Sequence, residues 1–349
     1  MCIFDGMNGS ENTGRSDLQD PYRNCVLCPR ACGVDRTAGE TGFCGQGAEM
    51  KAACVTLHKG EEPPVSGERG SGAFFFTGCT LRCPFCQNEQ ISSSGMGGPL
   101  SIDEFARICL EIEKRGGETI NLVTATQFIP SAVQGLCLAK ERGLSIPVVW
   151  NSGGFEKTES LALIAPVVDV YLPDCKTLDP VLSRSLFGRS DYPERAMEAV
   201  RFMAGQGEPE FSPSGIMTKG TIVRHLVLPG HLPETRQVLE WFSRELKDRA
   251  LLSLMVQDIP DERKEGGRRA EGAEPGESAR PAESGRIGED EYDQLLSWLD
   301  EFSIDEGFMQ ELGDDHPWIP DFDRTNPFPA EYSEIVWHWK DGARRFAVP

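Results

Sequence analysis

Three cysteines, Cys79, Cys83 and Cys86, lie at C-x3-C-x2-C spacing directly after the apolar run of residues 72–76. The run predicts a buried strand, and Thr77-Gly78 predicts the turn that ends it. Three thiolates this close can hold three irons of a four-iron cluster, and no fourth cysteine follows at ferredoxin spacing. The fourth iron would then lack a protein ligand, which is how a metal site binds and activates a small molecule.

Two other interpretations of this triplet are a zinc site and buried free thiols. Zinc usually takes four protein ligands in a closed site, commonly as two separated pairs of residues. A disulfide is disfavoured in a chain with intracellular features. The iron–sulfur interpretation is therefore the preferred one.

A second group of cysteines precedes the first. Cys25, Cys28, Cys32 and Cys44 fall within twenty residues that are rich in glycine and turn formers. Such a segment has too little apolar content to fold alone, so a metal would supply the missing stability. Zinc in a four-cysteine knuckle and a second iron–sulfur cluster both fit, and free thiols packed on the main domain are the alternative. Cys54 follows closely and is an alternative ligand.

The elements that must position these cysteines form an alternating pattern. A helix is predicted to begin at Ser101, with Glu104 at capping-box spacing, and to end at Gly116-Gly117. Further helices are predicted at 130–142, 159–165, 194–204, 233–249 and 291–301, and apolar strands at 72–76, 120–124, 148–151, 167–172, 221–228 and 251–256. The alternation predicts an α/β fold with a parallel sheet and helices outside it. A six-stranded open barrel and a doubly wound sheet both fit this pattern.

Composition divides the chain into parts. Residues 1–20, which include Cys2, predict a disordered tail, and residues 21–66 form a cysteine-rich segment. Residues 67–306 form the core, and within it residues 261–288 predict a disordered insertion because they contain almost no large apolar side chain. Residues 307–349 are a C-terminal extension whose aromatics we expect to pack on the core. A cover over the barrel mouth, or a groove for a partner, is the alternative role for this extension.

Charge and hydropathy limit the partners. The chain has 349 residues, a formal net charge of −20 and a pI of about 4.7. Such an acidic surface argues against nonspecific binding to nucleic acid or to anionic lipid. The sequence has no apolar run of about 18 residues, so no membrane span is predicted. The polar N-terminus does not resemble a signal peptide, and twelve cysteines then indicate metal binding in a reducing cytoplasm.

The triplet, with aromatic Phe85 before its last cysteine, resembles the radical SAM superfamily. That resemblance implies a partial TIM-type (β/α)6 open barrel, and a [4Fe–4S] cluster whose open iron is chelated by the amino and carboxylate groups of S-adenosylmethionine. The head segment, Cys-x2-Cys-Pro-Arg-x-Cys-Gly-Val-x-Arg followed by Gly-Glu-x-Gly-x-Cys, resembles that of a family described as similar to pyruvate formate-lyase-activating enzymes. Characterised activases with extra clusters carry the extra cysteines after the first motif, so no role is transferred to the head segment.

The same resemblance implies four cofactor-binding residues, each on or after a predicted strand; barrels of this kind place their active-site groups at the carboxyl ends of strands. Asn88 matches the Cys-x-Asn step of the activases, Asp174 and Lys176 match their Asp-x-Lys, and Arg224 matches the arginine of Val-Arg-x-Val-Val-x-Pro-Gly. The alternatives are a turn-forming asparagine for Asn88 and a surface ion pair for Asp174 with Lys176. We interpret His225 as a structural histidine.

One departure from the superfamily pattern follows the second predicted strand. Most members carry Gly-Gly-Glu there, which binds the methionine ammonium group of the cofactor. This chain has Val123-Thr-Ala-Thr-Gln127 instead. Thr124, Thr126 or a main-chain carbonyl must replace the missing carboxylate. Asn151-Ser-Gly-Gly154 resembles the activase Asn-x-x-Gly segment, and Gln257-Asp258 is expected to line the site.

The resemblance implies a radical SAM oxidoreductase of the pyruvate formate-lyase-activating-enzyme-like group. Such an enzyme takes an electron from a donor such as flavodoxin or ferredoxin and generates a 5′-deoxyadenosyl radical that abstracts hydrogen. Its substrate would be the glycine of a partner glycyl radical enzyme. The alternatives are a radical SAM enzyme that acts on a small molecule or another protein, and an iron–sulfur electron-transfer or metal-binding protein without radical chemistry. No side chain is an obvious acid or base, so no catalytic side chain is assigned.

Overall fold

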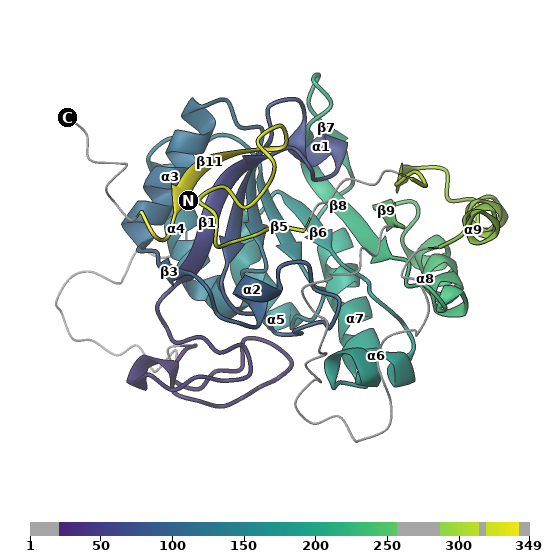
Figure 1. The fold of residues 1–349 in the computed structure, drawn as a ribbon, viewed down its shortest axis with the longest axis horizontal. Helices are drawn as coiled ribbons and strands as arrows, with labels where there is room; N and C mark the ends of the chain where they lie inside the picture. The colour runs from purple at the N-terminus through teal and green to yellow at the C-terminus, as the bar shows by residue number, and fades with distance from the viewer. Residues whose placement is uncertain (1–20, 257–286, 314–318, 342–349) are drawn as a thin grey trace.

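The computed structural model describes residues 21–256, 287–313 and 319–341, and Figure 1 shows its fold. The predicted disordered tail, nearly all of the predicted insertion, Gln257 and Asp258 lie outside the described residues.

The centre of the fold is a largely parallel sheet. Its strands follow the order β10-β9-β8-β6-β5-β4-β2-β1-β11. The six parallel strands in the middle are those that the apolar runs predict: β2 (Ser71–Phe76), β4 (Ile120–Val123), β5 (Val148–Ser152), β6 (Val170–Pro173), β8 (Met217–Leu226) and β9 (Leu251–Met255). In the described part of the chain, the end strands β10 (Gly307–Met309) and β11 (Ser333–His338) do not pair with each other. The sheet is therefore an open, partial barrel, as predicted.

Helices connect the parallel strands and cover one face of the sheet (Figure 1). The first begins as its sequence predicts, because Ser101 Oγ accepts a hydrogen bond from the Glu104 main-chain N–H at 3.2 Å. The six predicted helices are all present: α3 (Ile102–Lys114), α4 (Ile129–Glu141), α5 (Thr158–Ile164), α7 (Tyr192–Ala204), α8 (Leu232–Glu245) and α9 (Glu289–Glu301). The sequence analysis did not predict α6 (Pro180–Phe187), the short α1 (Pro63–Ser66) and α2 (Glu89–Ser92), the strands β3 (Gly98–Pro99) and β7 (Glu210–Phe211), or three 3₁₀ turns at Arg36–Ala38, Thr126–Phe128 and Ala165–Val167.

The two faces of the sheet bury different side chains. Alternate residues of a strand point to opposite faces. Phe74, Phe76 and Trp150 pack under α3 and α4 in the largest apolar cluster. On the opposite face, apolar residues of β5, β6 and β8 form a second layer, and Asn151 and Arg224 follow them toward the carboxyl ends of their strands. Strand alternation therefore brings polar side chains to the end of the barrel where the cysteine loop begins.

Strand β1 (Lys51–His58) extends the sheet beyond β2. It pairs antiparallel with β2 on one side and with β11 on the other. The sequence analysis included these residues in the cysteine-rich segment, and the domain boundaries given there remain a prediction. The C-terminal segment adds more than β11, because Phe322 and Phe328 are buried against Phe75 with ring centroids 5.7 and 5.1 Å away.

A search of the described residues finds no helix that is long and apolar enough to cross a membrane.

Candidate functional site

The cysteine loop begins where β2 ends. Gly78 has a φ of 85°, a left-handed conformation that favours glycine, and it turns the chain out of the strand. Within the loop, the Leu81 N–H lies 3.4 Å from Cys79 Sγ, and the Cys86 N–H donates to the Cys83 carbonyl at 3.1 Å. These contacts hold the three cysteines on one short loop at the carboxyl end of the strand.

Burial and neighbouring charges set the proton affinity of these thiols. Burial raises the pKa of the Cys83 thiol, the Lys176 ammonium opposes that rise, and the Cys79 and Cys86 thiols add to it. Burial and Cys79 also raise the pKa of Cys86. Without a metal, these two thiols hold their protons at neutral pH, so a metal must displace the protons as it binds.

The donor set fits a cluster better than a single metal ion. Across the described ranges, no three His, Cys, Asp or Glu side chains are grouped closely enough to hold one ion. In an iron–sulfur cubane each thiolate binds a different iron, so its ligands stand farther apart than those of a single zinc ion. Three thiols on a tight loop supply three of the four positions of such a cluster.

A buried ion-pair network lies beside the loop. Lys176 Nζ donates to Asp174 Oδ2 at 2.6 Å, and Arg224 Nε donates to Asp174 Oδ1 at 2.9 Å. All three side chains are only 15 % exposed. Asp174 directly follows β6 and Arg224 lies in β8, so neighbouring strand ends supply the network. Lys176 Nζ also lies 5.9 Å from the centre of the Phe85 ring, which connects the network to the cysteine loop.

Two further residues complete the network. Arg224 Nη2 donates to Asn151 Oδ1 at 2.5 Å, and Arg224 Nη1 lies 3.4 Å from Glu61 Oε2. Asn151 Nδ2 also lies 3.4 Å from Glu61 Oε1. The sequence analysis mentioned Asn151 only as part of a motif and missed Glu61. Glu61 lies between β1 and α1, 163 residues before Arg224, where neither periodicity nor a strand end identifies it.

Burial and neighbouring charges shift the pKa values of the carboxyl groups in the network in opposite directions. Burial alone would raise the pKa of Asp174, but Arg224 and Lys176 hold it below its usual range. Burial raises the pKa of Glu61 despite the nearby Arg224 cation. Burial likewise favours the neutral form of the adjacent Glu62. Asp174 is therefore the carboxylate that the two cations hold ionised most firmly, and Lys176 and Arg224 remain the groups in the network that can bind an anion.

Of the four predicted cofactor-binding residues, the structure brings three together: Asp174, Lys176 and Arg224. Asn88 instead precedes α2, and its main-chain N–H bonds to the Cys86 sulfur. In the described residues, no hydrogen bond joins the Asn88 side chain to those three. His225 is buried, with Nδ1 2.7 Å from the Cys175 carbonyl and Nε2 3.0 Å from Thr235 Oγ1, as a structural histidine requires.

The segment that departs from Gly-Gly-Glu keeps an unusual backbone. Thr124, at the end of β4, has a φ of 58°, which is an outlier for a β-branched residue. Its conformation is held by its own N–H, which donates to the Asn151 carbonyl, and by Gln127 Nε2, which donates to the Thr124 carbonyl. The Thr126 hydroxyl is already bonded to buried Glu156 at 2.8 Å. Backbone strain of this kind clusters at functional sites.

Glu156 is a second buried carboxylate that the sequence analysis did not identify. It accepts hydrogen bonds from Thr126 Oγ1, Trp150 Nε1 and Ser152 Oγ, and burial raises its pKa. These donors fix the loops that follow β4 and β5. Glu156 therefore links the segment that follows β4 to the carboxyl end of β5.

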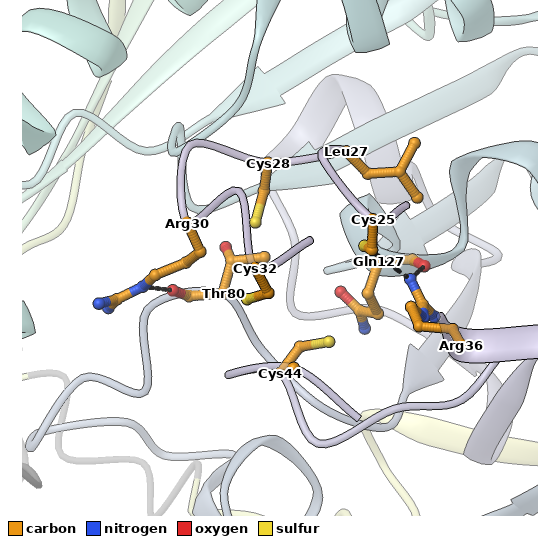
Figure 2. A pocket seen from close by; sticks show the side chains of 10 residues that line it. Cys25, Leu27, Cys28, Arg30, Cys32, Arg36, Cys44, Thr80 and Gln127 are labelled. Atoms are coloured by element: carbon orange, nitrogen blue, oxygen red, sulfur yellow. Dashed lines mark hydrogen bonds between the residues drawn. The ribbon is translucent and has the colours of Figure 1, made fainter. Parts of the chain in front are cut away.

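The four N-terminal cysteines come together as a second group. Cys25, Cys28, Cys32 and Cys44 line one cavity, and Figure 2 shows their thiol groups turned toward a common space. Burial raises the pKa of the Cys28 thiol to about 12, and the other three thiols add to that rise. Cys54 is not a member, because it lies in β1 and is buried beside Phe75 and Val123.

The N-terminal segment is packed directly on the cysteine loop. Arg30 Nε donates to the Thr80 carbonyl at 3.0 Å, and Thr80 itself lines the cavity of the four cysteines (Figure 2). A Cβ atom at Gly78 would lie only 2.6 Å from the Cys44 carbonyl oxygen, so glycine is required for this approach. The two cysteine groups therefore share a wall.

Comparisons with known proteins identify the family. The family model described as the radical SAM superfamily matches residues 74–242, which include the cysteine loop and the ion-pair network except Glu61. An uncharacterized protein of Methanocaldococcus jannaschii is 30% identical over 250 residues, which cover 69% of this chain and 67% of that protein. The chain belongs to the radical SAM superfamily, whose members use a [4Fe–4S] cluster and S-adenosylmethionine.

Several solved structures also resemble the chain. SuiB from Streptococcus suis, bound to S-adenosylmethionine, has a TM-score of 0.46 at 10% identity and covers 67% of this chain; the chain spans 48% of SuiB. A radical SAM methyltransferase from Sphaerobacter thermophilus has a TM-score of 0.44 at 14% identity, covering 67% and 63% of the two chains. A domain of pyruvate-formate lyase-activating enzyme from Bacteroides vulgatus has a TM-score of 0.33 at 11% identity, covering 50% and 87%.

Proposed function

We propose that this enzyme cleaves S-adenosylmethionine reductively on a cluster held by Cys79, Cys83 and Cys86. The observation that carries the proposal is the position of Lys176, which lies between the cysteine loop and the buried network of Asp174 and Arg224. Cys79, Cys83 and Cys86 would hold the cluster, and a bound cluster would supply the one-electron reduction of the sulfonium group that makes hydrogen abstraction from a substrate possible.

The chain's own residues bind and orient the cofactor. Asp174 fixes the two cations, and the charged donors of Lys176 and Arg224 suit the carboxylate of the methionine moiety. The Thr124 carbonyl replaces the missing Gly-Gly-Glu, because an oxygen that accepts one hydrogen bond from Gln127 Nε2 keeps a second lone pair for the ammonium group. Asn88 contacts the cofactor from the cluster side rather than from within the network.

Apolar packing excludes water from the site. Leu81 and Phe155 are almost completely buried next to the cysteine loop, in a cluster that includes residues of α6 and α7. A dry surrounding protects a radical from side reactions. This role accounts for the presence of α6 beside the loop, although the helix supplies no charged group to the network.

For the substrate, we propose the glycine of a partner glycyl radical enzyme. The support is the match of Asp174-x-Lys176 and of the Arg224 segment to the activase motifs. The reductant is a one-electron donor such as flavodoxin or ferredoxin, and the compartment is a reducing cytoplasm. A small molecule or another protein is the second candidate substrate, and binding of nucleic acid or membrane is not expected for so acidic a chain.

The test is an anaerobic assay of 5′-deoxyadenosine after reconstitution with iron and sulfide. Wild type is expected to form 5′-deoxyadenosine on reduction, and Cys83→Ala is expected to form none. Cys54→Ala is the matched control, because Cys54 is also a buried cysteine but lies in β1, away from both cysteine groups. A fully loaded, reduced wild-type cluster that forms no deoxyadenosine, with or without candidate substrates, would favour an electron-transfer protein without radical chemistry.

A further inference from the structure

We propose that Cys25, Cys28, Cys32 and Cys44 bind a second four-iron cluster, which passes electrons to the cluster at Cys79, Cys83 and Cys86. The existence of the second cluster stands on its own observations. Its role as a relay rests on the proposed function, because a relay requires a cluster to be reduced at the cysteine loop.

The backbone of the N-terminal segment presents the four thiols to one cavity. The Cys25 N–H donates to the Val34 carbonyl, and the Gly33 N–H donates back to the Cys25 carbonyl, both at 3.0 Å. A Cβ atom at Gly42 would lie 2.8 Å from Cys32 Sγ, so the absence of a side chain there makes room for the sulfur. The segment is therefore shaped around its cysteines.

The segment has a very small apolar core of its own. Its own apolar cluster has three buried members, Tyr22, Cys25 and Leu27, and one of them is a proposed ligand. Cores this small usually need a metal or disulfides to stay folded. The four cysteines form no disulfide with one another, so a metal centre is the stabiliser that the donor set offers.

The spacing of the four sulfur atoms favours a cluster over a single zinc ion. Zinc–sulfur bonds of about 2.3 Å would bring four tetrahedral sulfurs within about 4 Å of one another. Neither this group nor the loop cysteines form a single-ion site among the residues that the structure describes. The chain belongs to a family that builds a four-iron cluster on thiolates, and the second group offers four donors of the same type.

Donors surround the sulfurs as they do in iron–sulfur sites. The Phe43 N–H points to Cys32 Sγ at 3.4 Å, and Arg36 Nη1 lies 3.7 Å from Cys25 Sγ. The Arg36 side chain is 2 % exposed and is fixed by the Gly47 and Gln127 carbonyls. Hydrogen bonds and positive charge near the sulfurs favour the reduced, more negative state of a cluster.

The position of the group suits a relay. On its inner side, Thr80 lines the cavity and is the next residue after Cys79, and Arg30 bonds to the Thr80 carbonyl. On its outer side, Cys32 is exposed, so a donor protein can approach it. One electron would leave a flavodoxin- or ferredoxin-type donor, reduce the second cluster, and then reduce the first, which returns the second to its oxidised state.

The first experiment removes the three cysteines of the loop and measures the metal that the N-terminal cysteines still bind. The triple variant Cys79→Ala/Cys83→Ala/Cys86→Ala keeps the four N-terminal cysteines. After anaerobic reconstitution it is expected to hold about four iron and four sulfide per chain, and to give a four-iron EPR spectrum on reduction. One zinc and no iron per chain, or no metal at all, would overturn the second cluster. This readout does not depend on S-adenosylmethionine cleavage, so it separates the present proposal from the proposed function.

The second experiment tests the relay in the full chain. Two reduced clusters that share a wall are expected to broaden or split each other's EPR spectrum in wild type and in Cys54→Ala. The splitting should vanish in the triple variant and in Cys32→Ser. Cys32→Ser is also expected to lose most deoxyadenosine formation with flavodoxin while keeping it with dithionite, which reaches the first cluster directly. Unsplit spectra in wild type, or equal losses with both reductants, would refute the relay.

Discussion

Arg224 and Asp174 are joined twice, by a side-chain hydrogen bond of 2.9 Å from Arg224 Nε to Asp174 Oδ1 and by a parallel backbone bridge between the same residues. The backbone bridge lies where β6 and β8 run out, and the Cys175 N–H donates to the Arg224 carbonyl at 2.8 Å. The ion pair and the alignment of the two strand ends therefore support each other. A change in the ion pair or in the strand alignment would also move Lys176, because Lys176 bonds to the same Asp174 carboxylate.

Replacement of Asp174 by asparagine is expected to destabilise the fold and weaken cofactor binding together. The change leaves the buried Lys176 cation without its carboxylate and Arg224 with only Glu61, which costs about 3 kcal/mol in the free energy of unfolding. Urea denaturation and equilibrium binding of S-adenosylmethionine measure the two effects. The control is Asp191→Asn, which breaks the more exposed pair with Arg189 and should cost about 1 kcal/mol or less. Equal stabilities of the two variants would contradict a central role for Asp174.

Replacement of Lys176 by methionine is expected to affect the cofactor more than the fold. Methionine keeps the apolar stem, and Asp174 keeps its pair with Arg224. Loss of one charged hydrogen bond to the cofactor carboxylate, about 1.5–3 kcal/mol, predicts a fall in affinity of about 10- to 100-fold. Iron content should not change. Lys140→Met, which removes a half-exposed partner of Asp169, serves as the comparison. Unchanged affinity in Lys176→Met would remove Lys176 from the cofactor site.

Gly154→Ala is expected to disrupt the site through the backbone. Gly154 has a φ of 72°, and a Cβ atom there would lie 2.2 Å from the Asp174 carbonyl oxygen. Gly143 also has a positive φ, 106°, but a Cβ atom there meets nothing within 4 Å. Gly143→Ala therefore costs only backbone strain, about 1–2 kcal/mol, and Gly154→Ala costs clearly more. The comparison uses the midpoint of thermal or urea unfolding. An equal shift in both variants would show that the loop at Gly154 can move to accept a Cβ atom at little cost in stability.

The pH dependence of stability is expected to report His225. Burial lowers the pKa of His225 to about 4, below its unfolded value of about 6.5. Because the unfolded chain binds the proton more readily, stability from this residue is fully present above pH 6.5 and is lost as the pH falls toward 4. The loss reaches about 3 kcal/mol. His225→Gln should flatten the fall in unfolding free energy between pH 6.5 and 4, and an unaltered slope would contradict a neutral buried His225.

The sequence predicts much of this arrangement because the relevant rules are local. Apolar runs locate all six central strands, and the Ser101–Glu104 spacing fixes the start of α3. Parallel strands place their carboxyl ends at one edge, so Asp174, Lys176 and Arg224 were expected together, and they do meet. The position of Asn88 next to the cysteines was also expected, but its distance from the network depends on how α2 turns.

The sequence does not predict contacts that depend on long-range pairing. Glu61 lies in the connection between β1 and α1. It meets Arg224 only because β1 pairs with β2, which brings this connection next to β8. The apolar stretch 51–58 follows closely on the cysteines, so its strand was overlooked, although Ala52 to Leu57 are all buried. Thr124 likewise looks like an ordinary strand residue until its φ of 58° is known.

The pairing of β1 with β11 carries a consequence for synthesis of the chain. Cys54 lies opposite His338, so one edge of β1 obtains its partner only after almost the entire chain has been made. Chains that lack part of a domain expose apolar surface and unpaired strand edges, and such edges invite association with other chains. A nascent chain that stalls before residue 333 would therefore expose an unpaired edge of β1 that can associate with other chains.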